Sequence, residues 1–107
     1  MILKKNPPSE ADELARAIRS LHGCDSMWLR SVPVVEKYEG KIVWDGTVEV
    51  FWLHDHSTAK LCYTWSHEIE GSTKRRYVAI LHQPPVDSPQ AAVRAAIVQE
   101  HKANHPE

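Results

Sequence analysis

Residues 41–54 read Lys-Ile-Val-Trp-Asp-Gly-Thr-Val-Glu-Val-Phe-Trp-Leu-His. A polar break follows, then Ala-Lys-Leu-Cys-Tyr-Thr-Trp-Ser-His at 59–67, and after a second break Arg-Tyr-Val-Ala-Ile-Leu-His at 76–82. All three runs are rich in aromatic and β-branched residues and are joined by short, turn-like segments. This pattern predicts an antiparallel sheet.

The individual runs differ in how they alternate. In 41–53, apolar residues keep one parity on both sides of Asp45-Gly46, which favours a bulge inside one long strand over a turn between two. The run 59–66 alternates cleanly and predicts a half-buried strand. Residues 75–82 are apolar on both parities, which predicts a central strand. A further strand over 27–38 contains Pro33 and is expected to be bulged or at a sheet edge.

Two helices flank these strands. The first is expected at 9–22, with Ser9 as N-cap, Leu14, Ile18 and Leu21 on its apolar face, and Gly23 as its stop. The second is expected at 88–103, beginning with Ser88 as N-cap and Pro89 at the first helical position. Val93 and Ile97 mark its apolar face.

The predicted order is α-β-β-β-β-α. It indicates an α+β, two-layer domain in which a four-stranded antiparallel meander carries two terminal helices on one face. The opposite sheet face is expected to be open.

Size and composition indicate an ordinary globular protein. The 107 residues, 42% hydrophobic and 25% charged, suit one domain over 1–107 with an ordered core at about 9–103. A net charge of −1 argues against nucleic acid as a partner, although Lys74-Arg75-Arg76 forms a basic cluster. Because no signal peptide or membrane-spanning run is found, we expect a cytoplasmic protein without membrane contact. Of the two cysteines, Cys62 is expected to be a buried hydrophobe, and a disulfide with Cys24 stays open.

The open face is the main functional hypothesis. Five aromatic residues exceed what two short helices can cover, so they are predicted to form a self-association surface or a ligand groove. The alternative is that a bent sheet buries them around the helices. They are Trp44, Trp52, Tyr63, Trp65 and Tyr77.

Chemical sites are a second hypothesis. His54 and His56 lie on the same side of an extended chain, and with His67 they are a candidate metal site. Cys62 paired with His56 or His67 is the candidate for nucleophilic catalysis, but a mid-strand thiol does not suit that role. The carboxylates of Asp45, Glu49, Glu68 and Glu70 are expected on solvated faces, and we expect no cofactor.

One resemblance covers roughly residues 33–100. The segments Val43-Trp44-Asp45-Gly46-Thr47-Val48-Glu49-Val50-Phe51, Cys62-Tyr63, Trp65-Ser66, Pro84-Pro85-Val86, Ser88-Pro89 and Ala92-Val93-Arg94-Ala95-Ala96-Ile97, together with His56 and Ala59, resemble a group of short bacterial proteins of unknown function. The resemblance implies a compact bacterial domain and transfers no catalytic residue. We therefore predict a non-enzymatic binding module, a homodimer through its aromatic face or an edge strand, whose partner is a protein or a small apolar ligand. The alternative is a small enzyme or metal-binding protein that uses His54, His56 and His67.

Overall fold

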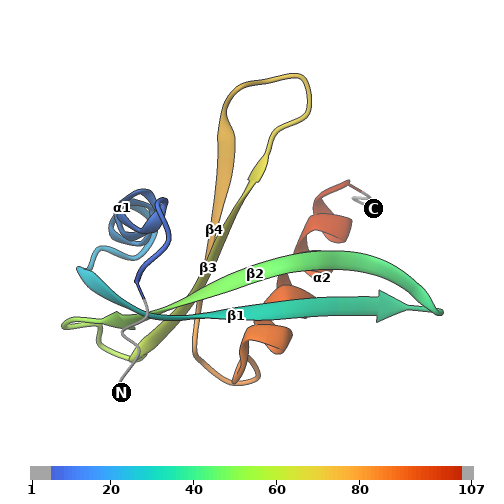
Figure 1. The fold of residues 1–107 in the computed structure, drawn as a ribbon. Helices are drawn as coiled ribbons and strands as arrows, with labels where there is room; N and C mark the ends of the chain where they lie inside the picture. Colours follow the sequence, from blue (N-terminus) through green and yellow to red (C-terminus); the bar gives the residue numbers. More distant parts are fainter. Residues whose placement is uncertain (1–5, 105–107) are drawn as a thin grey trace, which may run out of the picture.

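A computed structural model describes residues 6–104. The chain folds in the order helix, four strands, helix, as predicted (Figure 1). The elements are α1 (Ala11–His22), β1 (Ser26–Tyr38), β2 (Lys41–Leu53), β3 (Leu61–Glu68), β4 (Arg75–Leu81) and α2 (Pro89–Asn104).

The strands form one antiparallel sheet in the order β1-β2-β3-β4, which confirms the predicted meander. Glu39 and Gly40 both adopt positive φ angles, of 52° and 78°, and close the β1–β2 hairpin. Two consecutive left-handed residues give the tight turn that matches the natural twist of a hairpin.

The two helices cover opposite faces of the sheet, so the prediction that they share one face is wrong. Phe51 and Cys62 pack with α1, whereas their chain neighbours Val50 and Tyr63 pack with α2. Because successive strand residues point to opposite faces, this alternation places α1 and α2 on either side. The domain therefore has three layers, because one helix packs against each face of the sheet.

The same arrangement corrects the position of β4. Its apolar residues on both parities suggested a central strand, yet β4 is an edge strand. Tyr77 and Ala79 face α1, while Val78 and Ile80 face α2. Both faces of β4 are apolar because a helix packs near each, and not because strands flank it on both sides.

The strand β1 is the other edge and carries the expected irregularities. Its pairing with β2 shifts between Trp28 and Arg30, where Leu29 of β1 is the extra residue, and again between Glu36 and Lys37, where the extra residue is Val43 of β2. The bulge predicted at Asp45-Gly46 is not there, since Gly46 pairs in register with Val34. A Cβ atom at Gly46 would lie 3.0 Å from the Trp44 ring, so the glycine makes room for that side chain.

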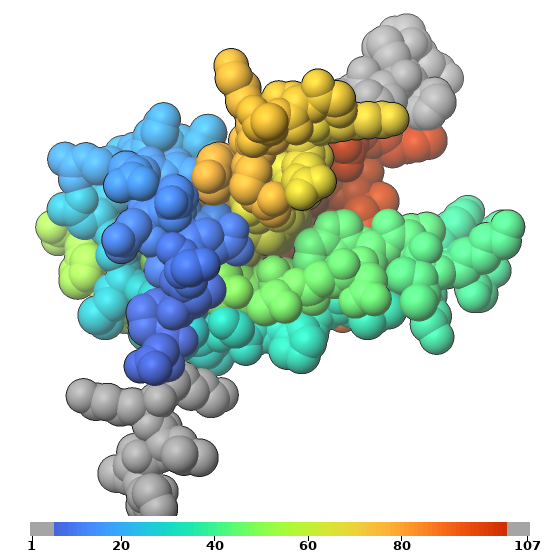
Figure 2. All heavy atoms as spheres, turned by 45° about the horizontal axis from the view of Figure 1, so that its top comes forward, coloured from blue at the N-terminus to red at the C-terminus, as the bar shows by residue number. Residues whose placement is uncertain are grey.

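The sheet divides into two hairpins beyond Glu49 and Thr64. The strands β2 and β3 pair only from Glu49–Thr64 to Trp52–Leu61, and Figure 1 shows the β1–β2 and β3–β4 hairpins diverging from there. On the α2 side of this fork, Trp44 and Trp65 meet edge to face with ring centroids 5.5 Å apart. The β1–β2 hairpin therefore projects from the body as an arm, seen in green in Figure 2.

The helix ends agree in part with prediction. α1 begins at Ala11, and its N-cap is Glu10 rather than Ser9, with no side-chain capping bond. Gly23 ends the helix in the left-handed conformation (φ 72°), as expected. Ser88 caps α2 by accepting a hydrogen bond from the Ala91 amide at 3.1 Å. Within residues 6–104 neither helix has the length and apolar character needed to span a bilayer.

Candidate functional site

The outer edge of β4 is built from alternating backbone groups. The His82 amide donates to the Leu61 carbonyl at 2.9 Å, and Tyr63 pairs with Ile80. In an antiparallel ladder, backbone groups alternate between the two sides of a strand. The amides and carbonyls of Ile80 and Val78 therefore point to β3, whereas those of Tyr77 and Ala79 point away from the sheet.

One of these outward groups is already bound. His22 Nε2, at the end of α1, lies 2.8 Å from the carbonyl oxygen of Ala79. A bond of this length requires the Ala79 carbonyl to face the free edge, which agrees with the ladder. The last turn of α1 is thus attached to the edge of β4.

A groove of about 480 Å³ follows this edge. The consecutive residues Tyr77 to Ile80 form its floor, Leu21 contributes the α1 wall, and Ala96 and Ile97 contribute the α2 wall. Trp44 and Trp65 line its inner end, near the fork. Its polar groups are His67, Arg76, Gln99 and Glu100. A volume of this size and a mainly apolar lining with a few polar groups are typical of binding sites.

The groove contains three of the five predicted aromatic residues: Trp44, Trp65 and Tyr77. Tyr63 is only 2% exposed and lies in the core beneath α2. Trp52 is 38% exposed and lies away from the groove, in line with Met27 and Leu61 on the neighbouring strands. Leu21, expected in the core, is 58% exposed at the groove wall.

Comparisons with protein-family models, with curated proteins and with solved structures found no match.

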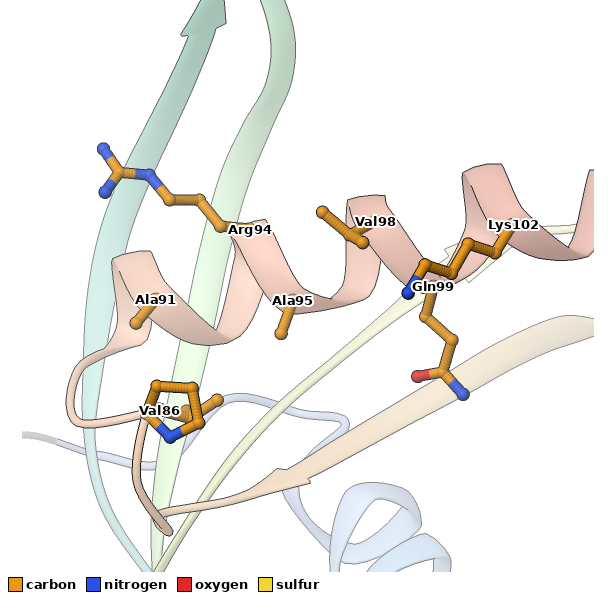
Figure 3. A pocket seen from close by; sticks show the side chains of 8 residues that line it. Val86, Ala91, Arg94, Ala95, Val98, Gln99 and Lys102 are labelled. Atoms are coloured by element: carbon orange, nitrogen blue, oxygen red, sulfur yellow. The ribbon is translucent and has the colours of Figure 1, made fainter.

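A second cavity, of about 490 Å³, lies on the outer side of α2 (Figure 3). Ala91, Ala95 and Val98 line it from one side of the helix, and Pro85 and Val86 close it from the preceding loop. Arg94 and Lys102 stand at its margins. This cavity has no exposed strand edge, so it offers apolar contact without backbone hydrogen bonds.

The three candidate metal ligands do not converge. His54 and His56 precede β3, whereas His67 lies near its far end, about 20 Å along the strand at roughly 3.3 Å per residue. His56 Nδ1 accepts the amides of Thr58 and Ala59, at 3.2 and 3.0 Å. In the part of the chain that the structure describes, no three metal-ligating side chains come together.

Both cysteines are free thiols in the α1-side core. Burial, with a smaller effect of nearby Cys24, raises the pKa of Cys62 to about 12. A thiol needs a lowered pKa to act as a nucleophile, so Cys62 stays protonated and has the structural role predicted for it.

Glu49 is a buried carboxylate that the sequence placed on a solvated face. It is 4% exposed, and its Oε1 accepts hydrogen bonds from Trp28 Nε1 at 2.9 Å and from the Ser31 hydroxyl. These donors come from β1 on the α1 side of the sheet. Its alternating position alone gave no sign of burial, because the covering tryptophan belongs to another strand.

Tyr63 and His82 form a second internal polar pair. The phenol oxygen of Tyr63 lies 2.6 Å from His82 Nδ1. Burial raises the pKa of Tyr63, so the phenol keeps its proton in this hydrogen bond. The pair ties β3 to the end of β4 below the groove.

Proposed function

We propose that this protein is a non-enzymatic interaction module and that the groove along β4 takes up an extended segment of a partner protein. The observation that carries the proposal is the juxtaposition of an edge strand and a groove. The outward amides of Tyr77 and Ala79 and the Tyr77 carbonyl lie on the floor of a mainly apolar groove, and the Ala79 carbonyl keeps one lone pair beside its bond to His22. A strand that joins such an edge gains main-chain hydrogen bonds, and pockets for alternate side chains give specificity.

The contrast between the two sheet edges supports this choice. Proteins block exposed edges with prolines, bulges and charges. The β1 edge carries Pro33 and a bulge at Leu29, and its pairing with β2 shifts again at Val43 of β2. Within Arg75–Leu81 there is neither a proline nor a register shift, and the last five residues are apolar. Of the two edge strands, β4 is the one whose pairing register is unbroken, as a further strand requires.

The groove also offers both kinds of contact that such a segment requires. Leu21 and Tyr77 present apolar surface on the α1 side, and Trp44 and Ile97 do so on the α2 side. Arg76 and Glu100 add opposite charges at the margin. An added strand would place alternate side chains toward the two walls.

The experiment uses a displayed library of short unstructured peptides as the probe. Selected peptides are titrated into isotopically labelled protein, and amide shifts are mapped by NMR. We expect the largest changes at Leu21, Tyr77 and Ala79. Ala79→Pro should abolish binding, because it removes one outward amide and adds a ring on the free edge, where proline is tolerated.

Val98→Ser is the matched control, since Val98 is exposed on the outer side of α2 and lines the other cavity. It should leave peptide binding unchanged. Selected peptides whose shifts map to Trp52 or to the cavity behind α2, or that bind Ala79→Pro as tightly as the parent, would contradict the proposal.

A further inference from the structure

We infer that the segment taken up in the groove is β4 of a second copy of this protein, paired antiparallel across a two-fold axis at Val78. This inference rests on the proposed function of the groove and names its partner. The result is a homodimer in which two four-stranded sheets become one continuous sheet.

The register follows from the length of β4 and from which of its residues have backbone groups that point away from β3. The strand has seven residues, Arg75–Leu81, and Val78 is its midpoint. Its outward-facing residues, Arg75, Tyr77, Ala79 and Leu81, are symmetric about that midpoint. A two-fold axis at Val78 sets Tyr77 opposite Ala79 of the other copy and Arg75 opposite Leu81. Every outward-facing residue of β4 then has an outward-facing partner, whereas a shifted symmetric register leaves residues beyond the ends. The carbonyls of Ala79 and Leu81 already accept from His22 Nε2 and from the Gln83 amide, so in the pair each accepts a second hydrogen bond through its other lone pair.

Side-chain size matches this register on the α1 side. Tyr77 faces the small side chain of Ala79 from the other copy, and the same pair recurs on the other side of the axis. An aromatic ring beside a small residue fills the cross-strand space without a clash. Leu21 is 58% exposed and lines this side of the groove, so it would be covered in the pair.

Charge selects the antiparallel orientation. Arg75 and Arg76 stand at one end of β4. In the two-fold pair, the two Arg75 residues are six positions apart, about 20 Å at roughly 3.3 Å per residue. A parallel pair would place the arginines side by side, which is destabilising.

Arg76 of one copy is opposite Ile80 of the other, on the α2 side. In this register the basic end of each strand lies beside the apolar end of the other.

The test combines the mass in solution with a cross-link that reports the register. The amide and carbonyl of Val78 point toward β3. The two Val78 residues therefore form a non-hydrogen-bonded pair, with Cα atoms about 4.5 Å apart. That separation suits a disulfide. Val78→Cys should oxidise to a covalent dimer under copper-phenanthroline. Ile80→Cys, on the same face, would lie opposite Arg76 and should not form the cross-link. Cys24 and Cys62 are buried and do not compete.

The expected result is a dimer by sedimentation at high concentration, loss of that dimer in Ala79→Pro, and a cross-link in Val78→Cys alone. A strict monomer, or equal cross-linking of both cysteine variants, overturns the inference. If the protein is monomeric but selected peptides still bind at β4, only the second-copy partner fails and the proposed function stands. If neither peptide nor a second copy binds at β4, both fail.

Discussion

His22 Nε2 lies 2.8 Å from the carbonyl oxygen of Ala79, so the last turn of α1 is bonded to the outer edge of β4. The contact joins residues 57 positions apart in the chain. It uses one lone pair of the Ala79 carbonyl and leaves the amide of the same residue facing the groove. α1 therefore positions the edge strand as well as covering one face of the sheet.

His22→Ala should lower the free energy of unfolding by about 1 kcal/mol, the usual net value of one hydrogen bond. Chemical denaturation measures the change. His22→Gln is the matched control, because its amide group can still donate to Ala79 and should recover part of the loss. Equal stability of all three proteins would show that the contact does not hold α1 to the edge.

Glu49→Ala should be more destabilising than its small volume change suggests. The substitution leaves the donors of Trp28 and Ser31 without their buried acceptor, at a cost of about 1–3 kcal/mol. Glu49→Gln keeps an acceptor oxygen and should cost less. Urea denaturation of both variants provides the comparison. A Gln variant as unstable as the Ala variant would contradict the role of the carboxylate oxygen as a shared acceptor.

The element order was predictable because the strands alternate with a period of two and the helices carry local signals where they begin or end. Gly23 and Ser88 mark helix ends by local chemistry, and the structure confirms both. The side of the sheet that each helix covers was not predictable in this way. A strand such as β4, apolar on both faces, fits a central position between strands and equally an edge position between two helices.

The same ambiguity limited prediction of the site. The sequence contains more aromatic residues than two short helices can cover, among them Trp44, Trp65 and Tyr77. The groove that these three share depends on where the helices pack. Leu21 follows the apolar period of α1, yet it lies past the end of the core and is exposed. Periodicity reports which side of an element is apolar, and tertiary packing decides whether that side is covered.

Acidification should weaken the attachment of α2 to β1. Hydrogen bonds from Gln90 and then from Arg94, with the Arg94 charge, hold the pKa of Glu36 below its usual value. A group with a lowered folded-state pKa contributes stability above its unfolded pKa, and this contribution is lost as pH falls through the folded value. Stability should therefore decline more steeply below about pH 4.5 in the parent than in Glu36→Gln. Denaturation at a series of pH values tests this, and parallel curves for the two proteins would refute it.

Cys62 should be inert to thiol reagents while the protein is folded. Its pKa of about 12 leaves almost no thiolate at neutral pH, and the side chain is fully buried. In a Cys24→Ala background, labelling by Ellman's reagent should follow global unfolding in denaturant. Because the folded pKa exceeds the unfolded one, the contribution of the neutral thiol should also be lost as pH rises from about 9. Rapid labelling of the native protein would show that Cys62 is accessible.

Two tryptophans that look alike in sequence should differ in how strongly their truncation destabilises the protein. Trp65 is 5% exposed, packs in the α2-side core and meets Trp44 edge to face. Trp65→Ala should therefore cost about 3–5 kcal/mol, as expected for a large side chain removed from a core. Trp52 is 38% exposed, and Trp52→Ala should cost markedly less.

The pair also separates stability from association. If β4 is the interface, Trp52→Ala should leave the dimer intact, because Trp52 lies away from the groove. A dimer that dissociates on Trp52→Ala, with the fold retained, would instead assign the interface to the surface around Met27, Trp52 and Leu61. Sedimentation and denaturation of the same two variants distinguish these outcomes, since loss of the dimer without loss of the fold can come only from a surface contact.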